Sequence, residues 1–141
     1  IKSRLSSTYP LTLVNARVGR QIGELITAVQ ADKSNVGDSP VVFDLGNNNQ
    51  LDEKDVVTLF NLLENQSQII VVNTAVPRGW KSQNNEIIKR IAWRYDRATL
   101  IDWNSISTGH PEFFGPDGVH LSEEGSKVYV SAILEAIKGN K

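Results

Sequence analysis

Hydrophobic residues along the chain follow two spacings, one typical of strands and one typical of helices. Nearly continuous apolar runs predict strands at residues 11–14, 41–45, 69–72 and 99–101. Apolar residues three or four positions apart predict helices at 21–29, 52–63, 84–95 and 122–139. Apolar strands that alternate with amphipathic helices are typical of a parallel sheet covered on both faces. The sequence therefore predicts an α/β fold.

Polar residues mark the ends of two predicted helices. Asp52 and Glu53 open one of them, where carboxylates suit the positive end of the helix dipole. Ser122 is placed to cap the last helix and Gly139 to close it. In a parallel sheet, the loops after the strands gather at one edge and carry the chemistry. Three such loops hold candidate polar groups, at residues 15–20, 46–50 and 102–120.

Composition excludes several classes of function. The net charge is −1 and no basic block is present, which argues against nucleic-acid binding. There is no cysteine, so thiolate catalysis and cysteine-ligated metals are excluded, and no metal site is expected. No apolar run approaches the roughly 18 residues of a membrane-spanning helix. A length of 141 residues suits one domain.

The most informative motif is Asp117-x-x-His120, at the entrance to the last helix. A carboxylate three residues before an imidazole can accept the Nδ1–H of the ring, which leaves Nε2 free as a base. Such a pair is often a coincidence of the surface, but this one follows the last strand in a loop shaped by proline and glycine. His110, the only other histidine, is expected to be structural.

Two further positions could stabilise a developing negative charge on oxygen. Asn48 follows a strand within Gly46-Asn47-Asn48, and its side-chain amide could donate to an oxyanion. Gly19 precedes a helix, and its backbone N–H could be a second donor. An ordinary turn for Asn48 and a helix-entry glycine for Gly19 are the alternatives.

Other residues receive weaker interpretations. Arg78 and Trp80 could line a substrate groove, with the indole as a stacking surface for a sugar, or could simply pack their loop. Asp44 stands within an apolar strand and is assigned no role. Ser39 belongs to a literal Gly-Asp-Ser, but it leads into a strand, which places it at the end of the sheet opposite the candidate site. It is therefore not expected to be a nucleophile.

Gly19, Gly46-x-Asn48 and Asp117-x-x-His120 resemble, in this order, three sequence blocks of the SGNH (GDSL-type) hydrolases. Longer stretches are similar to the extracellular C-terminal domain of type-3 acyltransferases, the peptidoglycan O-acetyltransferases of Gram-positive bacteria. They read Asn-Ala-Arg-Val-Gly-Arg-Gln, Val-Pro-Arg-x-Trp, Ile-Asp-Trp and Gly-His-Pro-Glu-Phe-Phe-Gly-Pro-Asp-Gly-Val-His-Leu. The resemblance covers essentially the whole chain.

The resemblance implies a three-layer α/β/α sandwich with a flavodoxin-like parallel sheet and a serine–histidine–aspartate triad. His120 would be the base and Asp117 its orienting carboxylate, while Gly19 and Asn48 would donate to the oxyanion. The serine of the family ends its first strand, and this strand is expected N-terminal to Ile1. The chain is therefore interpreted as a single SGNH-like domain over residues 1–141, N-terminally incomplete and inactive alone. The predicted strands at 11–14 and 41–45 would both pair with that first strand.

The implied reaction moves acetyl through an acyl-serine to a cell-wall glycan hydroxyl, or to water, without a cofactor. The expected partners are peptidoglycan and an acetyl donor. Membrane contact is expected only through an N-terminal transmembrane region outside this chain, which puts the domain on the extracellular face of a bacterial membrane. A non-catalytic glycan-binding domain is the alternative. A doubly wound cofactor-binding domain ranks last, because no glycine-rich phosphate loop is present.

Overall fold

Three parallel strands form the middle layer of the computed structural model, which describes residues 1–139. They are β1 (Val41–Asp44), β2 (Ile69–Val72) and β3 (Ala98–Ile101), in the spatial order β1-β2-β3. The register aligns the first residues of the three strands with one another. All four residues of β2 are buried, which fits a central strand with apolar side chains on both faces.

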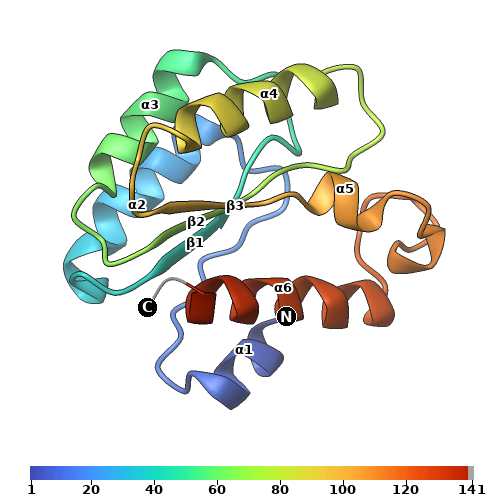
Figure 1. Cartoon of the computed structure of the whole chain (residues 1–141), viewed down its shortest axis with the longest axis horizontal. Coiled ribbons are helices and arrows are strands. Elements are labelled where there is room, and N and C mark those ends of the chain that lie inside the picture. Colours follow the sequence, from blue (N-terminus) through green and yellow to red (C-terminus); the bar gives the residue numbers. More distant parts are fainter. Residues whose placement is uncertain (140–141) are drawn as a thin grey trace.

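Helices cover both faces of this sheet. On one face lie α2 (Ile22–Val36), α3 (Glu53–Leu62) and α4 (Lys81–Ala92). On the other lies α6 (Glu123–Gly139), with the short α1 (Lys2–Thr8) beside it (Figure 1). The segment after β3 adds α5 (Trp103–Ser107) and the 3-10 turn η1 (Pro111–Phe113). The predicted three-layer α/β/α class is confirmed.

A separate hydrophobic core packs on each face of the sheet. Under α3, the fully buried Phe60 meets the ring of Phe43 edge-on, with centroids 5.5 Å apart. Above α6, Trp103 stacks on Phe113 at 6.0 Å and meets Tyr129 edge-on at 5.1 Å. The second core fixes the segment after β3 against α6, and this segment carries the Asp117–His120 motif.

Most predicted elements are present, with ends shifted by a few residues. Asp52 caps α3 by accepting the N–H of Lys54 at 2.8 Å. Ser122 Oγ accepts the N–H of Gly125 at 3.1 Å, as expected of a cap for α6. Gly139 is the last helical residue described, and whether it closes the helix lies outside the described residues. The structure adds α5 and η1, whose lengths of five and three residues are too short to show a clear period.

The strand predicted over residues 11–14 is wrong. This segment is irregular, and the side chains of Leu11 and Leu13 are 99% and 56% exposed. As expected, this segment does not pair with β1 in the described part of the chain, where β1 pairs with β2 alone. A strand needs a neighbour for its backbone groups, and the apolar pattern alone does not provide one.

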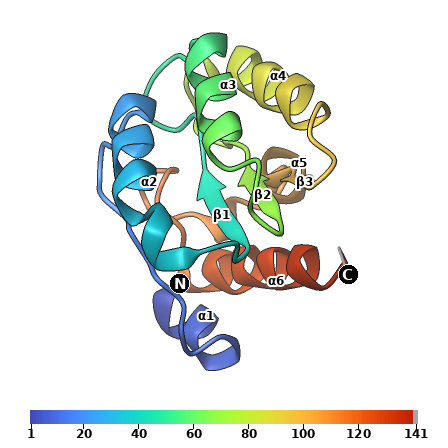
Figure 2. The ribbon, with the colours of Figure 1, turned by 90° about the vertical axis from the view of Figure 1, so that its left-hand side faces the viewer.

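The outer edge of β1 faces a large cleft. The cleft has a volume of about 930 Å³, and its walls come from α1, residues 9–17, α2, β1 and α6. Figure 2 shows β1 at the open edge of the sheet, between α2 and α6. The N–H groups of Val41 and Leu45 point to β2, so by alternation those of Val42 and Asp44 point into the cleft.

No helix among residues 1–139 combines the length and the hydrophobicity that crossing a membrane requires.

Candidate functional site

Residues 108–121 lie beyond the carboxyl ends of the strands, next to α5 (Figure 1). Their last part forms a closed turn in which the N–H of Gly115 donates to the carbonyl of His120 at 2.7 Å. Gly118 has φ +67°, a conformation that favours glycine. An isolated antiparallel bridge between Phe114 and Leu121 closes the base of the turn. The turn therefore presents the Asp117–His120 motif from a fixed base.

The structure brings Asp117 and His120 into direct contact. Nδ1 of His120 hydrogen-bonds to Oδ2 of Asp117, while Oδ1 accepts the backbone N–H groups of Val119 and His120, both at 2.9 Å. The hydrogen bond from the His120 side chain, followed by the two backbone bonds, lowers the pKa of Asp117 well below its ordinary value. Asp117 is therefore ionised at neutral pH.

The other side of the His120 ring is open. The side chain is 75% exposed, and Nε2 has no hydrogen-bond partner among residues 1–139. Because the carboxylate of Asp117 accepts from Nδ1, the proton of a neutral ring sits on Nδ1 and Nε2 carries the lone pair. This is the tautomer that a general base requires.

The loop after β1 is fixed by a residue that the sequence analysis missed. The fully buried Asn84, at the start of α4, accepts the N–H of Leu51 and donates to the carbonyls of Gly46 and Asn49. Gly46 has φ +96°, and a Cβ there would lie 3.3 Å from the side chains of Asn84 and Thr74. The close approach of α4 explains why glycine stands at this point.

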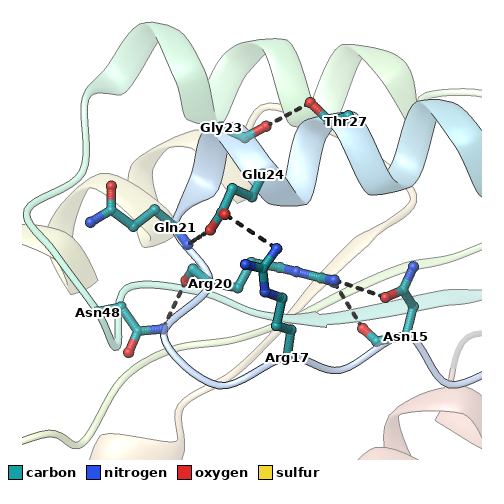
Figure 3. Close-up of polar contacts among 8 residues, drawn as sticks. All are labelled: Asn15, Arg17, Arg20, Gln21, Gly23, Glu24, Thr27 and Asn48. Carbon is teal, nitrogen blue, oxygen red and sulfur yellow. Dashed lines mark hydrogen bonds and ion pairs between the residues drawn. The ribbon is translucent and has the colours of Figure 1, made fainter.

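The predicted oxyanion residues come from neighbouring loops. Asn48 Nδ2 donates to the carbonyl of Arg20 at 2.8 Å (Figure 3). Arg20 directly follows Gly19 in the sequence. The Arg20 guanidinium in turn donates to the carbonyl and the side chain of Asn15 at 3.1 and 2.9 Å. Arg17 lies 3.4 Å from Glu24 in an exposed ion pair. These contacts tie the loop of Gly19 to that of Asn48.

The contacts of Arg78 and Trp80 do not single out a functional role for either residue. Arg78 is exposed, and its guanidinium donates to the neighbouring carbonyl of Pro77 at 3.4 Å. Trp80 is half-buried at the start of α4, and its indole N–H has no partner among the described residues. No hydrogen bond or ion pair within residues 1–139 links either side chain to the Asp117–His120 pair.

Ser39 and His110, which were expected to have no catalytic role, lie where the sequence predicts. Ser39 precedes β1, at the amino end of the sheet, and its carbonyl accepts from Gln66 at 2.9 Å. His110 stacks on Phe113 with centroids 4.5 Å apart and hydrogen-bonds through Nδ1 to Glu112 at 2.7 Å, as a structural histidine would. Residues 1–139 contain no cluster of three histidine or carboxylate side chains that could hold a metal.

Comparison with known proteins gives a consistent set of relatives. The chain is 37% identical over 138 residues to "Peptidoglycan O-acetyltransferase OatA" of Listeria monocytogenes. It is 33% identical over 139 residues to "Putative peptidoglycan O-acetyltransferase YrhL" of Bacillus subtilis. It is also 36% identical over 140 residues to "Putative O-acetyltransferase SAS0844" of Staphylococcus aureus.

The chain is a homologue of part of these O-acetyltransferases. The alignments cover 97–98% of this chain, and the resemblance noted in the sequence is confirmed. The chain spans only about a fifth of the length of these relatives, 22–23%. No protein-family model matches the chain.

Proposed function

We propose that this domain catalyses O-acetyl transfer to peptidoglycan through an acyl-serine intermediate. The observation that carries the proposal is the Asp117–His120 pair, whose ring is oriented by an ionised carboxylate and whose Nε2 is open. The names of the relatives support acetyl transfer and peptidoglycan as the acceptor. By the same analogy, the domain acts on the extracellular face of the membrane of a Gram-positive bacterium.

The nucleophile comes from a strand that occupies the cleft beside β1. Such a strand satisfies the outward-facing backbone groups of Val42 and Asp44 and covers the apolar walls of the cleft. Running parallel to β1, it ends at the same edge as the loops of Gly19 and Asn48. A serine at its carboxyl end therefore falls at the candidate site.

The reaction has two balanced halves. His120 Nε2 takes the proton of the serine hydroxyl as its oxygen attacks the acetyl carbonyl, and the donor's leaving group then takes that proton. In the second half, a glycan hydroxyl gives its proton to Nε2 and attacks the acyl-serine, and the serine oxygen takes that proton from Nε2 as the acetylated glycan is released. Water in place of the glycan gives acetate.

Gly19 and Asn48 stabilise the tetrahedral intermediates of both halves. A side-chain amide carries two hydrogens, and the hydrogen bond from Asn48 to the carbonyl of Arg20 uses one of them. The second hydrogen and the N–H of Gly19 donate to the oxyanion. Arg78 and Trp80 contribute to a glycan groove on the same edge.

Replacement of His120 tests this proposal. The protein is prepared in a form that extends N-terminal to Ile1 and includes the serine strand, and hydrolysis of a small acetyl ester is followed. His120→Ala should lower turnover about a thousandfold or more, because no other group takes the serine proton. Asp117→Asn should also lose activity while keeping the fold, because the ring loses the carboxylate that fixes its tautomer.

Near wild-type turnover in His120→Ala would contradict the assignment. A non-catalytic glycan-binding domain is then the better interpretation, and binding of peptidoglycan fragments without turnover would support it.

A further inference from the structure

A chain of side-chain hydrogen bonds runs across the sheet edge through Asp44. The hydroxyl of Tyr129, on α6, donates to Asp44 Oδ2 at 2.8 Å. On the other oxygen, Asn47 Nδ2 donates to Asp44 Oδ1 at 2.8 Å. Asn47 Oδ1 then accepts from the hydroxyl of Thr74, after β2, at 2.6 Å. One carboxylate thus connects α6, the end of β1 and the loop that carries Asn48.

Asp44 occupies this place without a charged partner. It lines the cleft and is an exposed residue, and only its contact with Tyr129 is partly buried. The other charged or titratable side chains that line the cleft are those of Tyr9, Arg17, Arg20 and Tyr129. None of these forms an ion pair with Asp44. The carboxylate of Asp44 is therefore held by neutral donors, with no cation to balance its charge.

The burial of the carboxyl raises the pKa of Asp44 to about 6, although the hydrogen bonds from Tyr129 and Asn47 act in the opposite direction. The ionised form accepts at both oxygens, whereas the protonated form carries a hydrogen on one of them. The bond from Asn47 is therefore stronger above pH 6 than below it.

We propose that Asp44 is a positioning residue for acetyl transfer. It holds the side chain of Asn47, and the peptide bond between Asn47 and Asn48 transmits this constraint to the amide of Asn48. This inference rests on the proposed function, because alignment of Asn48 matters only if that amide meets an oxyanion. The proposed role of Asp44 acts through Asn47.

Three substitutions in the extended protein separate positioning from simple support of the fold. Asp44→Ala removes the acceptor for Asn47 and should lower kcat for a small acetyl ester about tenfold, a part of the effect of losing an oxyanion donor, with KM little changed. Asp44→Asn keeps a neutral acceptor for Asn47 and should hold kcat, at every pH, near the value that the wild type has below pH 6 and above that of Asp44→Ala. Tyr129→Phe, the matched control, keeps the bond from Asn47 and should leave kcat near the wild-type value at alkaline pH, while the ionisation of Asp44 moves to higher pH because the bond from Tyr129 lowers its pKa.

The pH profile gives a second readout. The wild type should show an ionisation near pH 6 in kcat, with turnover rising as Asp44 loses its proton. That ionisation should be absent from Asp44→Asn, which has no carboxyl group. An unchanged kcat in Asp44→Ala, with His120→Ala inactive, would overturn the positioning role and leave the proposed function standing.

If all forms of the extended protein are inactive, a measurement that does not need turnover still tests the coupling between Asp44 and Asn48. Side-chain amide signals of Asn47 and Asn48 are followed by NMR as the pH changes. Both should shift with a midpoint near 6 in the wild type and in His120→Ala, and neither should do so in Asp44→Asn. If the Asn48 signal does not follow that of Asn47, the proposed coupling is wrong.

Discussion

Asn48 and Ser39 lie at opposite ends of β1. Replacing each of them therefore tests at which end of the sheet the reaction takes place. In the extended protein, Asn48→Ala should lower turnover of an acetyl ester by roughly a hundredfold, because the oxyanion loses a donor. Ser39→Ala is the control and should leave turnover unchanged. Acylation of Ser39 by a serine-directed sulfonyl fluoride, or loss of turnover in Ser39→Ala, would show that the site has been placed at the wrong end.

The role of a single residue can be predicted from the sequence where its interaction partner is close along the chain. Asp117 and His120 are three positions apart, so their contact follows from the motif itself. The partners Asp44 and Tyr129 are 85 positions apart, and Asn84 is 33 to 38 positions from the groups that it holds. Such contacts depend on the fold, which explains why the sequence assigned these residues no role.

Helices and strands differ in the same way, because some are predictable from the local sequence and others depend on the fold. β2 is recognisable because an apolar run of four β-branched residues fits a central strand. The segment at 11–14 has a similar pattern but lacks a neighbouring strand, and the pattern contains no information about that neighbour. Short elements such as α5 are fixed instead by tertiary packing, here the contacts of Trp103 with Phe113 and Tyr129.

The entry of α6 couples this helix to the turn that bears His120. Ser122 donates from its hydroxyl to the carbonyl of Glu112 at 2.6 Å, and its N–H donates to the carbonyl of Phe113 at 2.9 Å. Gly125 packs directly on the same backbone, because a Cβ there would lie 1.9 Å from the carbonyl oxygen of Phe113. The helix therefore cannot accept a larger residue without moving the turn.

Gly125→Ala should accordingly lower the free energy of unfolding by about 2 kcal/mol or more, measured by urea denaturation. Gly23→Ala, in the first turn of α2, is the matched control because a Cβ there meets nothing within 4 Å. It should be neutral or slightly stabilising, since alanine favours helix more than glycine does. Equal losses in the two variants would argue against the tight contact at η1.

At the scale of the whole molecule, the cleft beside β1 is expected to hold the serine strand. Amide hydrogen exchange tests this directly. In the extended protein, the N–H groups of Val42 and Asp44 should exchange at least about tenfold more slowly than in the chain of residues 1–141, because they become hydrogen-bonded. Val41 and Leu45 already donate to β2 and should change much less.

Equal exchange of Val42 and Asp44 in the two forms would show that no strand pairs with this edge. The site would then need another source for its nucleophile.

The uncovered edge of β1 also has a consequence for association between copies of the chain. An unpaired strand edge is a template for intermolecular β-pairing and aggregation. Pro40, just before the strand, has no N–H to offer to an incoming strand. Within the strand itself, only the N–H groups of Val42 and Asp44 point outward. The edge of β1 therefore offers a foreign strand only a short ladder, which limits self-association.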